Sequence, residues 1–203
     1  MSAVTAYTQS LLACRRCPRM RAQFKRLRLS LPDYWNQPVP PSGPAESPLL
    51  IVGLAPGKHG ANRTGLPFTG DASGDLLFAV LEELGLQQQV RITNAVKCLP
   101  IANLPSTSEI VNCQRHLKPE LTPGLILLCL GGVAHRATIR ALGARQSENP
   151  FEHGRIHSLA TVTLVDSYHC SRYNTQTRRL TQNMFRDVVE LAAGLAGMLK
   201  ARK

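Results

Sequence analysis

The sequence predicts an α/β fold in which a parallel sheet of four strands is covered by helices on both faces. Four short apolar runs rich in Val, Ile and Leu alternate with longer stretches of helical periodicity. Such alternation builds βαβ units, whose parallel strands are buried on both faces. The 203 residues, of which 43% are hydrophobic, suffice for one sizeable core. We therefore expect a single domain over residues 1–203.

The apolar runs and the helical patterns give the expected elements of this core, which covers residues 49–203. The expected strands cover residues 49–52, 90–96, 125–130 and 160–165. The expected helices cover residues 73–84, 106–121, 133–142 and 175–199. Residues 1–48 differ in character, because they hold a short helix candidate, a Cys-x-x-Cys turn and six prolines between positions 31 and 48. The proline-rich part is expected to be a connector.

The charge balance indicates a polyanionic partner. The chain carries 24 Lys and Arg against 13 Asp and Glu, a net charge of +11, without one long basic run. Nucleic acid is the commonest partner of such a protein, whereas solubility or a basic host proteome is the alternative. Only 5% of the residues are aromatic, which disfavours an extensive base-stacking platform.

Neither a targeting segment nor a membrane span is expected. The N-terminal MSAVTAYTQS lacks the basic start and apolar stretch of a secretory signal, and the longest apolar run, near residues 125–133, is too short to cross a bilayer. The expected location is therefore the cytoplasm, where disulfides are disfavoured. The six cysteines need another explanation.

Four of these cysteines have a spacing that suggests a metal centre. Cys14 and Cys17 form a close pair, Cys98 follows after eighty residues, and Cys113 follows after fourteen more. Zinc ribbons usually supply two close pairs, whereas an iron–sulfur cubane accepts looser spacing because each thiolate binds its own iron. Iron–sulfur, zinc and unrelated buried cysteines all stay open on spacing alone. Cys129 lies in an expected core strand and is interpreted as a small hydrophobe.

Three polar or glycine-rich segments follow expected strands. They cover residues 53–57, 94–100 and 166–174. In open parallel sheets the ligand site lies beyond the carboxyl ends of the strands. The three segments should therefore meet on one rim of the sheet.

These segments resemble known motifs. The stretch GLAPGKHGANRTGLPFTGDASGDLL, from Gly53, resembles the first motif region of family 4 and family 5 uracil-DNA glycosylases. ITNAVKC resembles the strand that carries a base-reading Asn and the third cluster ligand, and HCSRYNTQTRRLTQNMF resembles the second motif. The resemblance runs from about Cys14 to Phe185 and favours family 5.

The resemblance implies a three-layer α/β/α fold and a structural 4Fe–4S cluster on Cys14, Cys17, Cys98 and Cys113. It also implies a DNA-repair hydrolase that acts on DNA containing deaminated bases, uracil and also hypoxanthine or xanthine. No lysine lies in a motif typical of a Schiff-base nucleophile, so a monofunctional enzyme that leaves an abasic site is expected. We expect a monomer, associated with the nucleoid through DNA.

Three residues carry the chemistry that the resemblance implies. Phe68 would stack on the base, Asn94 would pair with its O4 and N3–H, and His169 would hydrogen-bond its O2 as negative charge develops. The alternatives are a core Phe, a turn Asn and a structurally satisfied His. Further binding residues are expected at Gly53, Leu54, Ala55, Gly57 and Ser171.

Two departures from the family pattern affect the site. Leu54 stands where family 4 has a Glu, and leucine cannot orient or deprotonate water. Asp75 is the first candidate for this role and Asp71 the second, although Asp75 would also suit the first turn of a helix capped by Ser73. Cys170 replaces the Pro of the second motif, which would loosen that loop.

A different class of function is open as well. The net charge, the cysteines and the missing acidic residue at position 54 also fit a non-catalytic iron–sulfur protein that binds nucleic acid or senses redox state. Cleavage of uracil-containing DNA separates the two readings.

Overall fold

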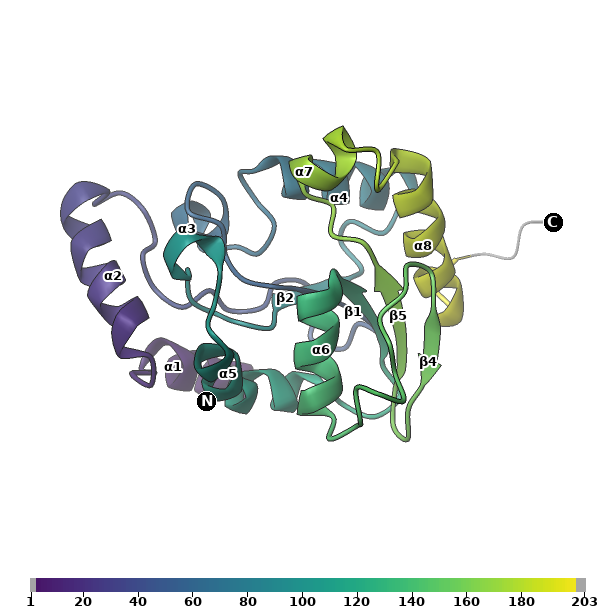
Figure 1. Ribbon diagram of the computed structural model, residues 1–203, viewed down its shortest axis with the longest axis horizontal. Helices are drawn as coiled ribbons and strands as arrows, with labels where there is room; N and C mark the ends of the chain where they lie inside the picture. Colours follow the sequence, from purple (N-terminus) through teal and green to yellow (C-terminus); the bar gives the residue numbers. More distant parts are fainter. Residues whose placement is uncertain (1–2, 200–203) are drawn as a thin grey trace.

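The computed structural model describes residues 3–199 and is built around one five-stranded sheet. The strands are β1 (Leu49–Gly53), β2 (Arg91–Asn94), β3 (Ile126–Leu130), β4 (Ile156–Ser158) and β5 (Thr163–Ser167). They lie side by side in the order β2-β1-β3-β5-β4 (Figure 1). The four expected strands are confirmed as parallel neighbours, so their carboxyl ends share one edge of the sheet.

The sequence did not predict the fifth strand, β4, which pairs antiparallel with β5 at the edge of the sheet. It is three residues long, and only its central residue, His157, is buried. Such a segment has neither the length nor the apolar run that marks a strand in a sequence.

Helices and short 3₁₀ turns connect the strands. They are α1 (Ala3–Leu12), α2 (Pro18–Ser30), α3 (Ala61–Thr64), α4 (Ala72–Glu83), η1 (Ile101–Asn103), α5 (Thr107–Leu117), η2 (Lys118–Glu120), α6 (Gly132–Ala141), α7 (Arg172–Gln176) and α8 (Gln182–Leu195). Within residues 3–199, none of them combines the length and the apolar character needed to cross a bilayer.

The sheet is the middle layer of a three-layer α/β/α sandwich. Successive side chains of a strand face opposite sides, so Leu49 and Ile51 pack against α4 and α8, whereas Leu50 and Val52 pack against α5 and α6. Figure 1 shows these two helix pairs on opposite faces of the sheet. Because both faces of the sheet are buried, each strand is a continuous apolar run in the sequence instead of an alternation of apolar and polar residues.

The helix expected over residues 175–199 is two helices. Arg178 has a positive φ of 57°, which ends α7. The side-chain oxygen of Thr181 then accepts a hydrogen bond from the amide of Met184 and begins α8. The cap and the left-handed residue interrupt a segment whose apolar periodicity alone predicts one helix.

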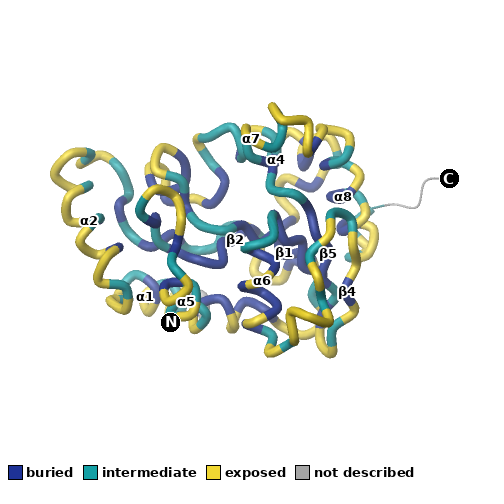
Figure 2. Tube along the Cα trace, in the orientation of Figure 1, coloured by how far each residue is buried: buried dark blue, intermediate teal, exposed yellow. Residues whose placement is uncertain are grey.

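The N-terminal segment lies beside the β2 edge of the sheet. Figure 2 shows α2 as a largely exposed helix, buried only along the side that carries Met20 and Phe24. The connector after it is not a free linker, because Ser42 exchanges two backbone hydrogen bonds with Ile92. It thereby covers the outer edge of β2, which would otherwise present unpaired backbone groups.

Candidate active site

A pocket of about 340 Å³ lies at the carboxyl end of the parallel strands. Side chains from the segments that follow β1, β2 and β5 line it together, as expected from the strand order. The lining residues are Leu54, Ala55, Pro56, Gly57, Ala61, Phe68, Asp71, Ser73, Asn94, Asn103, His169 and Ser171.

Phe68 forms an apolar wall of the pocket and is held in an unusual backbone conformation. Its φ is 55°, and a bulky residue at positive φ is a rare, strained arrangement. A Cβ on Gly74 of α4 would lie 1.8 Å from the carbonyl oxygen of Phe68, so helix and loop touch through a position that must be glycine. The ring of Phe68 faces the imidazole of His169, with centroids 6.1 Å apart and planes inclined by 29°.

Asn94 is the last residue of β2 and pairs in register with Gly53 of β1. It is 4% exposed, and its side-chain amide has no hydrogen-bond partner among residues 3–199. A Cβ on Gly53 would lie 2.4 Å from Asn94 Oδ1 and 2.5 Å from two ring atoms of Phe68. Gly53 therefore lies behind these two side chains, and its missing side chain lets them approach each other.

His169 follows β5 and is fixed by its own loop. Its carbonyl oxygen accepts a hydrogen bond of 2.7 Å from Asn174 Nδ2, and its Cβ packs against Gly131. Burial lowers the pKa of the imidazole below the ordinary value of 6.5, and the nearby Asp71 carboxylate offsets this only in part. The ring is therefore neutral at neutral pH and can donate one hydrogen bond into the pocket.

Cys170 occupies the motif position usually held by proline and is fully packed. Its thiol donates to the carbonyl oxygen of Ser73 at 3.3 Å, and burial raises the pKa of the thiol to about 12. This contact ties the His169 loop to the start of α4. Ser171 lines the pocket and precedes α7, but its hydroxyl does not cap that helix.

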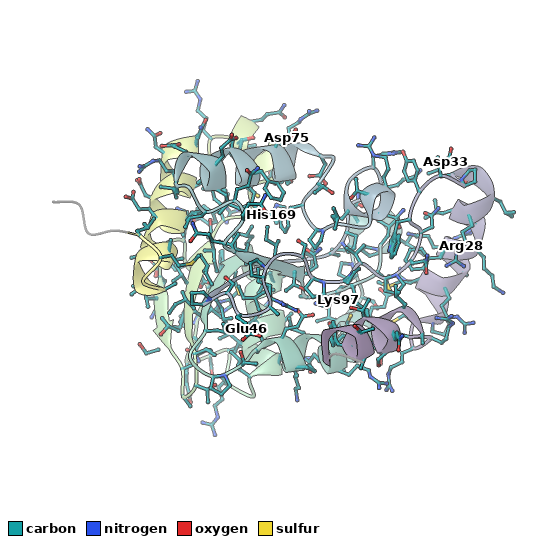
Figure 3. All side chains as sticks on the ribbon, turned by 180° about the vertical axis from the view of Figure 1, so that it is seen from behind. Arg28, Asp33, Glu46, Asp75, Lys97 and His169 are labelled. Atoms are coloured by element: carbon teal, nitrogen blue, oxygen red, sulfur yellow. The ribbon has the colours of Figure 1, made fainter. Side chains whose placement is uncertain are left out.

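The two candidate carboxylates are placed differently. Asp75 lies on the exposed side of α4 (Figure 3) and is not part of the pocket lining, whereas Asp71 lines the pocket. The expected capping residue is also corrected, because Asp71 instead of Ser73 caps α4. Asp71 Oδ1 accepts from the amides of Ser73 and Gly74 at 3.1 and 3.0 Å. Its Oδ2 faces Gly57 and Gly60, beside the pocket.

Sequence reasoning missed Asn103, which brings a second carboxamide to the pocket. Ala102 and Asn103 both have positive φ, 52° and 57°. Consecutive left-handed residues cost energy and are found where a loop must aim a side chain. The segment IANLP carries no glycine, so nothing in the sequence indicates this turn.

The four cysteines Cys14, Cys17, Cys98 and Cys113 line a second cavity of about 120 Å³ between α1, α2, α5 and the segment after β2. Burial raises the pKa of the Cys17, Cys98 and Cys113 thiols. The Lys97 amide donates to Cys113 Sγ at 3.2 Å. Such a hydrogen bond stabilises the deprotonated thiolate, which is the form of cysteine that binds a metal.

The donor set of this cavity suits a metal–thiolate group. Four cysteine thiols line one space, and four thiolates are the ligand set of an iron–sulfur cubane as well as of a structural zinc site.

Comparison with known proteins decides the family. The model of the family described as Uracil DNA glycosylase superfamily matches residues 40–193. The chain belongs to this superfamily. The match contains the five strands and every residue that lines the pocket.

Within the uracil-DNA glycosylase superfamily, two type-5 relatives are more similar to the chain than a type-4 relative is. A type-5 uracil-DNA glycosylase of Thermus thermophilus is 42% identical, over 95% of this chain and 98% of the relative. One of Pyrobaculum aerophilum is 39% identical, over 95% and 93% of the two chains. A type-4 uracil-DNA glycosylase of Archaeoglobus fulgidus is 27% identical, over 94% of each. The expected family and fold are confirmed, and the expected enzyme class is that of these relatives.

Proposed function

We propose that this chain is a monofunctional DNA glycosylase that hydrolyses the N-glycosidic bond of uracil in DNA, and also of hypoxanthine and xanthine. The observation that carries the proposal is the pocket itself. An aromatic face, a free carboxamide, a neutral imidazole and a carboxylate, from Phe68, Asn94, His169 and Asp71, line one cavity at the carboxyl end of the sheet.

The first step is to bind a base outside the helix. A base stacked in a duplex cannot reach such a pocket, so the nucleotide must be extruded into it. The ring of Phe68 replaces the lost stacking, since any planar base can lie on an aromatic face. The net charge of +11 supports binding to the phosphate backbone.

Asn94 reads the edge of the base. Its amide oxygen accepts from an N–H while its nitrogen donates to the adjacent carbonyl. Uracil, hypoxanthine and xanthine all present a carbonyl next to an N–H, whereas cytosine and adenine present an amino group next to a bare nitrogen. One carboxamide therefore accepts all three deaminated bases, and the apolar Leu54 adds no polar contact that would reject a larger ring.

His169 stabilises the leaving base. As the glycosidic bond breaks, negative charge accumulates on the base, and the neutral imidazole donates a hydrogen bond to its O2. Removing one donor of this kind typically costs about 10²- to 10³-fold in rate. A neutral imidazole can donate from a buried position without a counter-ion, whereas a buried imidazolium would need one.

Asp71 holds the water. Its Oδ1 is tied to the start of α4, so its position is fixed, while Oδ2 faces the pocket wall at Gly57. The sugar develops oxocarbenium character before water bonds to it, so a weak base suffices and a negative carboxylate also stabilises the developing positive charge. This role replaces that expected for Asp75, which is exposed outside the pocket.

The product is an abasic site. No lysine is among the residues that line the pocket, so the described part of the chain offers no amine there for a Schiff base with the sugar. Water is then the only nucleophile, and the DNA strand stays intact.

We also propose that Cys14, Cys17, Cys98 and Cys113 bind a 4Fe–4S cluster. When bound, it supplies a covalent cross-link among three distant segments and no step of the hydrolysis. Cys98 lies four residues after Asn94. The cross-link therefore fixes the end of the strand that carries the base-reading amide, and rigid support of this kind preserves the geometry of a site.

The test is excision by cluster-replete protein from oligonucleotides that carry one uracil, hypoxanthine, xanthine or cytosine at the test position, followed by alkaline cleavage. We expect cleavage at the first three bases and none at cytosine, whose amino group and bare ring nitrogen do not match the Asn94 amide. His169→Ala should retain the iron and lose at least about 10²-fold in rate. Binding without cleavage by protein with a full cluster would contradict the proposal and favour a non-catalytic iron–sulfur protein that binds nucleic acid.

A further inference from the structure

A second cluster of ligand-type side chains lies behind the pocket, outside the proposed chemistry. His135 of α6, His157 of β4 and Asp166 of β5 meet in the interior, where they are 1%, 5% and 0% exposed. Their ligand atoms all lie within 4.8 Å of one another. One helix and two neighbouring strands thus direct two imidazoles and one carboxylate at a single point.

The contacts within this cluster are direct. His135 Nδ1 lies 2.8 Å from Asp166 Oδ1, and His157 Nε2 lies 2.9 Å from Asp166 Oδ2. The other nitrogen of His135, Nε2, lies 2.8 Å from the carbonyl oxygen of Asn149, to which it must donate. A neutral imidazole has only one N–H, so Nδ1 then presents a lone pair to a carboxylate oxygen. The lone pair of Nδ1 and the carboxylate oxygen are both hydrogen-bond acceptors, so they stay in contact only if a proton or a metal ion lies between them.

The buried negative charge of Asp166 also requires a cation beside it. A fully buried carboxylate is costly unless it is paired with a positive charge. Among the described residues, no Lys or Arg nitrogen lies within 4.0 Å of this carboxylate, and its ion-pair partners are the two histidines alone. The cation must therefore be a proton on an imidazole or a metal ion held by all three groups.

The surroundings match those of a metal ligand set. Two histidines and one carboxylate are a common set for zinc and other first-row divalent metals. A ligating histidine almost always donates its second N–H to a backbone carbonyl or a carboxylate, as His135 does to Asn149. The second carboxylate oxygen also accepts from the Glu152 amide at 3.4 Å, which orients it.

From this geometry we propose that His135, His157 and Asp166 form a structural site for one divalent transition metal, Zn²⁺ by ligand type. Zinc bonds of about 2.0–2.1 Å at tetrahedral angles need ligand atoms about 3.3 Å apart. Binding therefore widens the present N–O separations of 2.8 and 2.9 Å by roughly 0.5 Å. The metal displaces the protons between the three groups.

The metal site would link the edge of the sheet to the elements next to His169. β4 is only three residues long, and the metal would bind it to β5 and α6. Asp166 is three residues before His169, and α6 begins directly after Gly131, against which His169 packs. We expect a gain in stability without a part in the hydrolysis, so the site is independent of the proposed activity.

The test measures metal content of the full chain. Cluster-replete protein, purified anaerobically from zinc-supplemented cells, should contain one zinc per chain besides its iron. His157→Gln should lose this zinc and keep the iron. His153→Gln is the matched control, because His153 stacks on Tyr168 nearby but lies outside the ligand set, and it should keep both.

A second measurement needs no variant. The zinc absorption edge of the wild-type protein should show a shell of nitrogen and oxygen ligands with imidazole scattering, and chelation of zinc should lower the melting temperature while the cluster spectrum is unchanged. Only trace zinc in the wild-type protein would overturn the proposal and leave a histidine proton as the counter-charge. Sulfur ligands in the zinc shell, or equal zinc in His157→Gln, would overturn it too.

Discussion

The ring of Phe68 packs over Gly53 so closely that a Cβ on Gly53 would lie 2.5 Å from ring atoms Cε2 and Cζ. The same Cβ would lie 2.4 Å from Asn94 Oδ1. The end of β1 thus sets the distance between the surface that stacks the base and the amide that reads it. A glycine outside the pocket lining therefore controls the shape of the pocket.

We expect Gly53→Ala to lower uracil excision by about 10²-fold, because it displaces both Phe68 and Asn94, and misplacement by 1 Å has effects of this size. The overpacking should also lower the free energy of unfolding by about 1–3 kcal/mol. Single-turnover excision and denaturant unfolding measure the two effects. The control is Gly194→Ala in α8, where a Cβ meets nothing within 4 Å, and which should be neutral or stabilising. Equal activity of the two variants would contradict this view of the pocket.

The roles of the two carboxylates can be separated directly. Asp71→Asn preserves the helix cap, since asparagine caps as well as aspartate, but removes the negative charge beside the pocket. We expect it to lower the single-turnover rate by about 10²- to 10⁴-fold without loss of stability. Asp75→Asn changes an exposed residue of the same helix and should leave the rate unaltered. A reversed result would return the water-handling role to Asp75.

The protonation of His169 gives a pH prediction. Burial disfavours the charged imidazole, so its pKa lies below 6.5, and the ring should still be mostly neutral at pH 6.5, where an ordinary histidine is half protonated. The unfolded chain binds this proton more readily, so the stabilising contribution is complete above pH 6.5 and is lost as pH falls through the folded pKa. Histidine NMR titration, with His169→Gln to assign the signal, measures the midpoint. A midpoint at or above 6.5 would show that the ring is not in a desolvated pocket.

The cluster proposal predicts which cysteines control iron. Cys98→Ser and Cys113→Ser should lose the iron, the acid-labile sulfide and the visible absorbance together. Cys129→Ala should keep all three, because Cys129 is buried in β3, where its thiol donates to Thr138 and packs in the apolar core. Its cost should be a modest loss of stability, of about 1 kcal/mol. Zinc without iron in anaerobically prepared protein would contradict the iron–sulfur assignment.

A buried ion pair next to the cysteine cavity predicts a large stability effect. Lys97, labelled in Figure 3, is 0% exposed. Its ammonium donates to both oxygens of Glu120, at 2.8 and 2.9 Å. Tyr7 donates to the same carboxylate. Glu120→Gln leaves the ammonium buried without a counter-charge and should lower the free energy of unfolding by about 3–5 kcal/mol.

The matched control for this pair is Glu148→Gln, which removes an exposed ion pair with Arg145. Its effect should stay below about 1 kcal/mol, since water and salt screen exposed pairs. Denaturant unfolding of both variants makes the comparison. A similar small effect in both would show that Lys97 reaches solvent when Glu120 is neutral.

The four parallel strands and most of the pocket could be predicted from the sequence because both follow from one rule. Continuous apolar runs mark strands buried on two faces, and the residues after each run meet at one edge of the sheet. This rule placed Asn94 and His169 at one rim, and the motif resemblance added Phe68; the structure has all three in one pocket. The spacing of the cysteines and the motifs together singled out Cys14, Cys17, Cys98 and Cys113, which do line one cavity.

What the sequence left open depends on single positions. Asp71 and Asp75 are one helical turn apart, and which of them faces the pocket is decided by the cap, which periodicity does not reveal. The position of Asn103 depends on two consecutive residues in the left-handed backbone conformation, Ala102 and Asn103, neither of which is a glycine. The cluster of His135, His157 and Asp166 joins three elements through tertiary packing alone. Each depends on contacts between segments that no local pattern records.

The measurement that tests the central claim most directly is the release of free uracil from a DNA strand with one internal uracil, by cluster-replete protein in single turnover. We expect free uracil and an unbroken abasic strand in equal amounts, with cleavage of the strand only after alkali. A strand nicked before alkali would contradict the monofunctional mechanism. No released uracil from protein with a full complement of iron would contradict the assignment of this pocket as a glycosylase active site.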